Sequence, residues 1–216
     1  MVEISNQTKP LAKETLSPEG CPKGLEYYKH FLSQAEQAQL LQRIDAEPWE
    51  EAGNSPRRVQ QYGFKYEHAS RELSTEGQRS IPSWLEPLLD KISACQIMNP
   101  RPNQVIINEY LPGQGIRLHL DNIHHFGATI VSISLGSCAV MRFTSLAEPP
   151  QVKDVMLEPG SLVVLNDESR YRWQHEIPSR LVDKVGDHEF TRGRRVSITL
   201  RTVSLDASSD KEPETA

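Results

Sequence analysis

Residues 108–122, NEYLPGQGIRLHLDN, contain a complete turn of the chain between two strand-like segments. Asn108 and Tyr110 alternate along the first segment, so their side chains lie on one face of a strand. Proline and glycine then mark a bend. The second segment carries His119 and Asp121 two positions apart, which predicts an imidazole and a carboxylate side by side on one face.

Strand-like segments continue on the carboxyl side of this stretch. Several short strands separated by turn residues are typical of a β-sandwich or barrel. On the amino side, residues 33–49 are predicted to form a helix, because Ser33 and Glu36 make a capping box and Pro48 stops it. Residues 81–94 predict a second helix with one leucine-rich face. Helices followed by strands predict an α+β fold with the helices packed outside a β core.

The composition is that of a soluble globular domain. The 216 residues are 37% hydrophobic and 25% charged, with a net charge of −5 that argues against strong non-specific binding to nucleic acid. Without a signal peptide, a membrane-spanning run or paired cysteines, we expect an intracellular monomer, in the cytoplasm or nucleus and away from membranes. We expect a flexible arm at 1–23, one folded domain at 24–204 and an acidic disordered tail at 205–216.

The pair of His119 and Asp121 is a candidate half of a metal site. Taken alone it is weak, because this composition predicts about one His-x-acid pair by chance, and a surface ion pair is the alternative. A facial triad for Fe(II) needs a second histidine. His175 is the best placed, since it lies in the strand-like RYRWQHEI (170–177) on the same face as Tyr171, whereas His188 lies in a predicted loop.

The segment RRVSITLR (194–201) alternates between apolar and polar residues. Arg195 and Arg201 fall on the polar face, opposite the valine, isoleucine and leucine. Arginines are rarely buried without a partner, and a small dicarboxylate would match their guanidinium groups. Asn108 and Tyr110 could then donate hydrogen bonds to the same ligand. The alternatives are a sheet face open to solvent, a turn asparagine and a core tyrosine.

In this order, the motifs resemble those of the AlkB family of Fe(II)- and 2-oxoglutarate-dependent dioxygenases. The resemblance runs from about residue 25 to residue 202 and includes the IPSWL stretch (81–85) before the core. It implies a double-stranded β-helix, or jelly roll. The matching residues are Asn108 and Tyr110, His119 and Asp121, His175, and the pair Arg195 and Arg201.

The resemblance also implies roles for these residues. Iron would be held by His119, Asp121 and His175, and Arg195 would bind the distal carboxylate of 2-oxoglutarate. Asn108 and Tyr110 would assist Arg195. Arg201 would lie near the other end of the co-substrate or shape the substrate side. Together with O2, these cofactors would support hydroxylation of a C–H bond.

Within the family, RRVQQYGFKYE (57–67) and ESRYRWQHEI (168–177) are similar to the branch that hydroxylates a modified wobble uridine in transfer RNA. We therefore expect a modified or alkylated base in RNA or single-stranded DNA as the substrate. Basic and aromatic residues would contact phosphate and stack on bases: Arg57, Arg58 and Tyr62, with Arg170 and Arg172. The alternative is that Tyr62 and Phe64 are core residues of a strand and that the arginines only solvate it. The alternatives are oxidation of a protein side chain or small molecule, and a non-catalytic β-roll scaffold.

Overall fold

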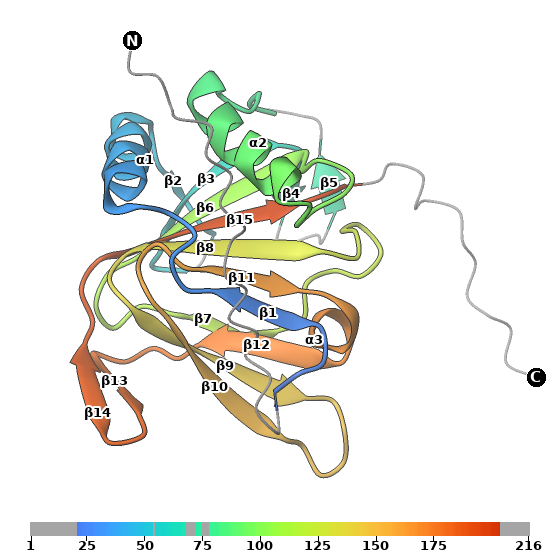
Figure 1. Cartoon of the computed structure of the whole chain (residues 1–216), viewed down its shortest axis with the longest axis vertical. Helices are drawn as coiled ribbons and strands as arrows, with labels where there is room; N and C mark the ends of the chain where they lie inside the picture. Colours follow the sequence, from blue (N-terminus) through green and yellow to red (C-terminus); the bar gives the residue numbers. More distant parts are fainter. Residues whose placement is uncertain (1–20, 54, 68–71, 75–77, 204–216) are drawn as a thin grey trace, which may run out of the picture.

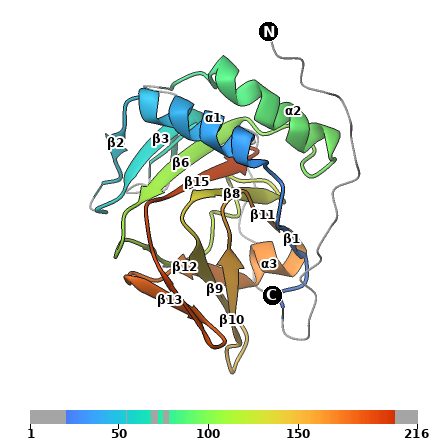
Figure 2. The same cartoon turned by 60° about the vertical axis from the view of Figure 1, so that its left-hand side comes forward.

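Two antiparallel sheets that face each other form the centre of the molecule (Figures 1 and 2). The computed structural model describes residues 21–53, 55–67, 72–74 and 78–203. The predicted acidic tail and all but three residues of the predicted arm lie outside these ranges. No helix in the described part of the chain is long and apolar enough to cross a membrane.

The larger sheet has seven strands in the order β1-β11-β8-β15-β6-β3-β2. These strands are β1 (Leu25–Tyr28), β2 (Glu50–Glu51), β3 (Arg58–Gly63), β6 (Gln104–Tyr110), β8 (Ile130–Gly136), β11 (Leu162–Leu165) and β15 (Arg195–Arg201). The smaller sheet has the order β10-β9-β12-β7. Its strands are β7 (Ile116–His119), β9 (Ala139–Ser145), β10 (Val152–Leu157) and β12 (Trp173–Ile177). Two hairpins complete the strands: β4 (Lys65–Glu67) with β5 (Glu72–Ser74), and β13 (Val182–Val185) with β14 (His188–Thr191).

The chain passes back and forth between the two sheets. β6, β8, β11 and β15 belong to the larger sheet, whereas β7, β9, β10 and β12 belong to the smaller one. This alternation is the double-stranded β-helix, so the fold expected from the sequence is confirmed. It also brings β7 and β12 together as neighbours, although they are more than 50 residues apart in the chain.

Helices α1 (Gln34–Ala46) and α2 (Glu86–Ala94) cover the outer face of the larger sheet (Figures 1 and 2). α1 begins at the predicted capping box of Ser33 and Glu36. α2 follows a short 3-10 turn, η1 (Ser83–Leu85), and buries its leucine-rich face. These helices enclose one apolar core against the larger sheet, and a second apolar core lies between the two sheets.

Strand β15 separates an apolar outer face from a polar inner face, as its sequence predicts. Val196, Ile198 and Leu200 are fully buried under the helices. Arg195 and Arg201 point the other way and are also buried, at 3% and 8% exposure. The inner face is therefore not open to solvent, which excludes the alternative of a solvated sheet face.

Two local expectations are wrong. Residues 170–171 do not begin a strand, because Asn166 and Ser169 form a capping box that nucleates the short helix α3 (Asp167–Tyr171). β12 begins at Trp173, so Tyr171 is 40% exposed and does not share a face with His175. His188 lies at the start of β14 rather than in a loop.

Candidate metal centre

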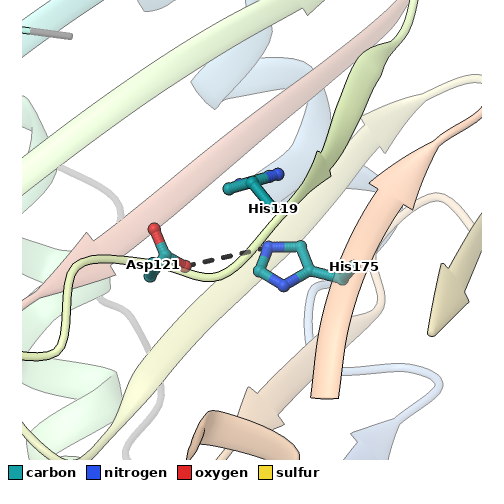
Figure 3. Close-up of side chains that lie close together, drawn as sticks. All are labelled: His119, Asp121 and His175. Carbon is teal, nitrogen blue, oxygen red and sulfur yellow. Dashed lines mark ion pairs between the residues drawn. The ribbon is translucent and has the colours of Figure 1, made fainter. Parts of the chain in front are cut away.

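His119, Asp121 and His175 converge at the inner side of the smaller sheet (Figure 3). His119 ends β7 and stands opposite His175 of β12 in the strand register. Asp121 follows two residues later, beyond the end of β7. One ligand atom from each of the three side chains lies within 4.8 Å of the others, and the two imidazole centroids are 4.4 Å apart.

The hydrogen bonds of this cluster leave metal-binding atoms free. Nδ1 of His119 lies 2.8 Å from the carbonyl oxygen of Arg117. A carbonyl only accepts, so Nδ1 carries the proton and Nε2 presents a lone pair. Oδ1 of Asp121 accepts a 2.5 Å hydrogen bond from Nη2 of Arg201, while Oδ2 lies 3.7 Å from Nε2 of His175.

The electrostatic environment keeps these groups in the protonation states that a metal needs. Burial alone would raise the pKa of the Asp121 carboxyl, but the charge of Arg201 and its other neighbours holds that pKa well below its usual range. Burial, and next the proximity of His119, lowers the pKa of His175 to about 3. At neutral pH the site is therefore a carboxylate with a neutral imidazole beside it.

Two imidazoles and one carboxylate suit a divalent metal such as Fe(II). This is the donor set of the facial triad, in which three protein ligands on one side leave positions for other ligands. The residues present therefore fit iron. The alternative of a surface ion pair does not describe Asp121, which is 7% exposed, and His175 beside it is 8% exposed.

Arg195 is a buried cation whose charge no described carboxylate neutralises by direct contact. Its Nη2 donates to Oγ of Ser134 at 2.9 Å, and its guanidinium lies over the ring of Tyr110, 5.3 Å from the centroid. Its Nε is buried and has no hydrogen-bond partner among the described residues. Burial lowers the pKa of Arg195, which is the sign of a charge held away from water. Such a group fits the carboxylate of a bound ligand.

Arg201 lies closer to the metal cluster than Arg195 does. Besides Asp121, it contacts Oε1 of Gln104 at 3.4 Å and lies 4.5 Å over the ring of Phe126. Its Nε is also buried and has no hydrogen-bond partner in the ranges that the structure describes. Arg201 therefore holds the Asp121 carboxylate in place and keeps donor capacity on the inner face.

Asn108 and Tyr110 lie on β6 beside β15, facing the same interior. Asn108 stands opposite Ser197, and Tyr110 stands opposite Arg195. The side-chain oxygen of Asn108 accepts a 3.1 Å hydrogen bond from Nε of Arg57. Asn108 is thus an inner-face residue rather than a turn asparagine.

The structure corrects most of the expected nucleic-acid contacts. Tyr62 is 1% exposed and packs edge-on against Trp84 in the outer core, so it cannot stack on a base. Arg58 lies on the outer face, where it pairs with Glu109, and Arg57 is turned inward to Asn108. Arg170 is 1% exposed. Of the five residues expected to touch nucleic acid, only Arg172 is exposed with no bond from its side chain to a described residue.

Arg170 instead stabilises the backbone of the segment that begins at the metal ligand Asp121. Its guanidinium donates to four backbone carbonyl groups, those of Asp121, Asn122, Phe126 and Gly127. Arg170 therefore fixes the segment that carries the aspartate ligand. The sequence pattern did not indicate this role, because it predicted that Arg170 belongs to a strand, whereas Arg170 lies in α3.

Further inner-face residues were missed from the sequence. Ser132 and Ser134 of β8 point inward, where Ser132 shares a 2.9 Å hydrogen bond with Ser197 and Ser134 binds Arg195. The signal was present in the alternation of IVSISLG (130–136), whose serines fall two residues apart. Arg57 was noted from the sequence, but as a residue that would contact nucleic acid rather than as a partner of Asn108.

Comparison with known proteins agrees with this geometry. The model of the 2OG-Fe(II) oxygenase superfamily matches residues 24–201. The chain is 33% identical to the "Alkylated DNA repair protein ALKBH8 homolog" of Arabidopsis thaliana, over 88% of this chain and 61% of that protein. It is 31% identical to the mouse (Mus musculus) "tRNA (carboxymethyluridine(34)-5-O)-methyltransferase ALKBH8", over 87% of this chain and only 29% of that protein.

A solved structure of OsALKBH1 shares the fold, with a TM-score of 0.63 at 19% identity, over 84% of this chain and 97% of that one. The superfamily match covers nearly the whole described chain, and the His-Asp-His cluster within it has the donor set for iron. The chain therefore belongs to the 2OG-Fe(II) oxygenase superfamily, in its AlkB family, and is a dioxygenase that uses Fe(II), 2-oxoglutarate and O2.

Proposed function

We propose that this dioxygenase hydroxylates or oxidatively demethylates a modified or alkylated base in nucleic acid, either RNA, including transfer RNA, or single-stranded DNA. The observation that carries the proposal is the nature of its relatives. One is named for repair of alkylated DNA and another for modification of a transfer-RNA uridine, and both align over most of this chain. The proposal names a class of substrate that both share.

In this proposal the inner-face residues divide the work of binding. His119, Asp121 and His175 hold Fe(II). Arg195 binds the distal carboxylate of 2-oxoglutarate, supported by its buried, unpartnered Nε. Tyr110, beneath the guanidinium, closes that end of the site. When bound, the cofactors supply the oxidation: 2-oxoglutarate becomes succinate and carbon dioxide, one atom of O2 enters succinate, and the other enters a C–H bond of the substrate.

Asn108 and Arg201 complete the set. Asn108 assists at the co-substrate, because its amide lies on the same face as Tyr110 and Arg195. Arg201 keeps the Asp121 carboxylate ionised and oriented, and its unpartnered Nε is available to a ligand oxygen. The positive charges of Arg195 and Arg201 also favour the binding of an anionic co-substrate at the metal.

The depth of the metal centre favours an unstacked base as the target. Asp121 and His175 are almost completely buried, so the reacting carbon has to enter the barrel. A base in a duplex reaches such a site only by leaving its stack, which single strands make easy. Exposed Arg117 lies in β7, and exposed Arg172 directly precedes β12, so both offer cations to phosphate near the metal ligands. The net charge of −5 favours modest, salt-sensitive binding.

The test is succinate release from 2-oxoglutarate in the presence of candidate substrates. The panel contains transfer RNA with modified wobble uridines, methylated RNA and single-stranded DNA oligonucleotides, and a protein lysate. We expect turnover with at least one nucleic acid, and mass spectrometry of that nucleic acid to show added oxygen or a lost methyl group with formaldehyde. Stimulation by the lysate and by no nucleic acid would reject the proposal and favour a protein hydroxylase.

Asp121→Ala provides the matched control in the same assay. It removes an iron ligand, so it should abolish succinate release with every substrate. Succinate release that persists in Asp121→Ala would come from a contaminating activity and would not count as turnover by this chain.

A further inference from the structure

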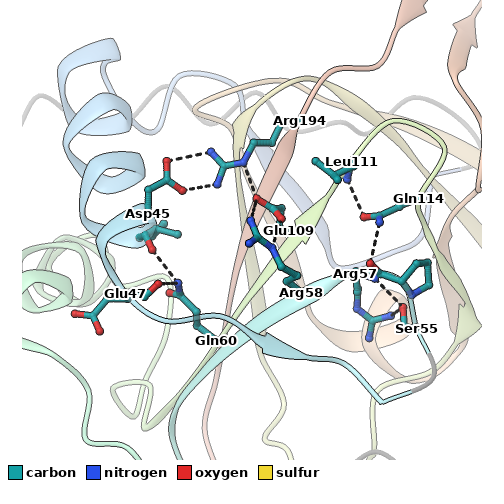
Figure 4. Close-up of polar contacts among 12 residues, drawn as sticks. Asp45, Glu47, Ser55, Arg57, Arg58, Gln60, Glu109, Leu111, Gln114 and Arg194 are labelled. Carbon is teal, nitrogen blue, oxygen red and sulfur yellow. Dashed lines mark hydrogen bonds and ion pairs between the residues drawn. The ribbon is translucent and has the colours of Figure 1, made fainter.

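A short segment of Ser55, Pro56 and Arg57, here called the strap, is hydrogen-bonded to the bend between β6 and β7. Figure 4 shows Ser55 and Arg57 beside Gln114 of that bend. Nε2 of Gln114 donates to the carbonyl oxygen of Pro56 at 2.8 Å, and Oε1 of Gln114 accepts from the backbone N–H of Leu111 at 2.9 Å. Gln114 therefore ties the strap to the bend that leads to the metal-binding strand β7.

The strap carries Arg57 into the interior, next to Asn108. Arg57 is 9% exposed, and its Nη1 donates to Oγ of Ser55 at 2.9 Å while its Nε donates to Oδ1 of Asn108 at 3.1 Å. Arg58 takes the opposite direction to the outer face and binds Glu109 through two nitrogens. The two adjacent arginines thus point to opposite faces of the same sheet. Of these two, Arg57 lies on the inner face, where the co-substrate is proposed to bind.

The contact decides which way the Asn108 carboxamide points. A guanidinium has donors and no acceptors, so the group that faces Nε of Arg57 has to be the amide oxygen. The amide nitrogen is then turned away from Arg57. No residue in the described part of the chain accepts a hydrogen bond from this nitrogen, so both of its N–H donors remain for a ligand.

We propose that Arg57 is a positioning residue for 2-oxoglutarate: it locks the Asn108 carboxamide in the orientation that presents N–H donors to an oxygen of the co-substrate. The inference rests on the role of Asn108 in the proposed function. Without Arg57 the amide can rotate by half a turn and present its oxygen to a ligand carboxylate, which is repulsive. The expected consequence is weaker binding of 2-oxoglutarate, with the metal site intact.

The test measures the Kd of 2-oxoglutarate by titration calorimetry on the full chain loaded with Mn(II), which avoids oxidation during the experiment. Loss of this hydrogen bond leaves the Asn108 amide free to turn, so Arg57→Met should raise Kd by about 3- to 10-fold. Arg57→Lys should recover part of the loss, because an ammonium group also only donates. Arg58→Met is the matched control on the outer face and should leave Kd unchanged.

A double-mutant cycle separates positioning from direct contact. Asn108→Ala alone should weaken binding, and adding Arg57→Met should cause no further loss. Independent, multiplicative losses would overturn the inference, since Arg57 would then act without Asn108. Kd unchanged in Arg57→Met, with Kd raised in Asn108→Ala, would overturn it as well.

Asn108→Asp tests the same idea without altering Arg57. The carboxylate keeps an acceptor for Arg57, so the strap and the ligand-free melting temperature should be preserved, yet the site loses its donors. We expect Kd to rise at least as much as in Asn108→Ala, and wild-type affinity would overturn the inference. If Arg195→Ala and Asn108→Ala both bind 2-oxoglutarate normally, the assigned co-substrate site itself is wrong, which is distinct from failure of Arg57 alone.

Discussion

Removal of the Arg195 side chain should weaken the binding of 2-oxoglutarate severely. Arg195 is 3% exposed, and within the described part of the chain only its Nη2 has a hydrogen-bond partner, Ser134. The remaining donors face the interior, so a ligand carboxylate there has Arg195 as its principal cation. Arg195→Ala would leave that carboxylate buried and unpaired.

The size of the effect follows from this burial. Truncating one partner of a buried, hydrogen-bonded charge pair costs about 2–5 kcal/mol, most of it from the charge left without a partner. At about 1.4 kcal/mol for each tenfold change, Kd should rise by about 30-fold to several thousand-fold. Arg195→Lys should recover only part, because a point charge cannot replace the two-pronged guanidinium.

Anaerobic titration of the Fe(II)-loaded chain with 2-oxoglutarate measures this Kd through the visible absorbance of the iron–co-substrate complex. Arg58→Ala removes an arginine from the outer face of the same sheet and should leave the titration unchanged. Equal Kd values for wild type and Arg195→Ala would refute the reasoning. A uniform loss of iron in both arginine variants would instead point to damage of the fold, which the ligand-free melting temperature detects.

The other predictions concern the metal and the stability of the fold. Asp121→Ala and His175→Ala should each lose the single equivalent of Fe(II), measured by metal analysis, whereas exposed His30→Ala should retain it; full iron content in both ligand variants would contradict the triad. Arg170→Met should lower the free energy of unfolding by about 3 kcal/mol or more, since it strands buried carbonyl groups, and a change within about 0.5 kcal/mol in urea titrations would exclude this scaffold role. Although burial opposes it, hydrogen bonds from Arg192, the Val140 N–H and Arg180 lower the pKa of Asp183, so its stabilisation is present above the usual carboxyl pKa of about 3.9 and is lost as the pH falls through the lowered value. Asp183→Asn should therefore lower the urea midpoint at pH 6 and flatten its decline towards pH 3, and a decline parallel to that of wild type would contradict the assignment.

Alternation along strands accounts for what could be predicted of the site. In RVSITLR (195–201) the apolar residues and the two arginines are expected on opposite faces, and the structure places them so, with Arg195 and Arg201 inward. Asn108 and Tyr110 follow the same rule on β6. The capping box of Ser33 and Glu36 likewise marks the start of α1. In each case the strand face or helix start depends on residues a few positions apart in the chain, so the local sequence pattern is sufficient to predict it.

Prediction failed where the partner lies far away in the sequence. Arg57 and Arg58 are adjacent and chemically identical, and their directions depend on whether Asn108 or Glu109 stands alongside, about 50 residues later. Tyr62 was expected at the surface because it follows basic residues, but the packing of η1 against β3 covers it. Arg170 was expected to meet phosphate, but the return of the chain after Asp121 supplies carbonyl groups that bury it.

The sequence by itself determined that two helices precede a series of strands, that β6 and β15 each carry polar residues on one face, and which residue types can bind iron and a dicarboxylate. These properties follow from the two-residue period of a strand and from the chemistry of single side chains. Only the tertiary structure decided which histidine completes the triad, because His175 reaches His119 through the pairing of β12 with β7. It also decided that the side chains of Arg57 and Arg170 are buried, since a charge is buried only where the fold brings in hydrogen-bond partners from distant segments.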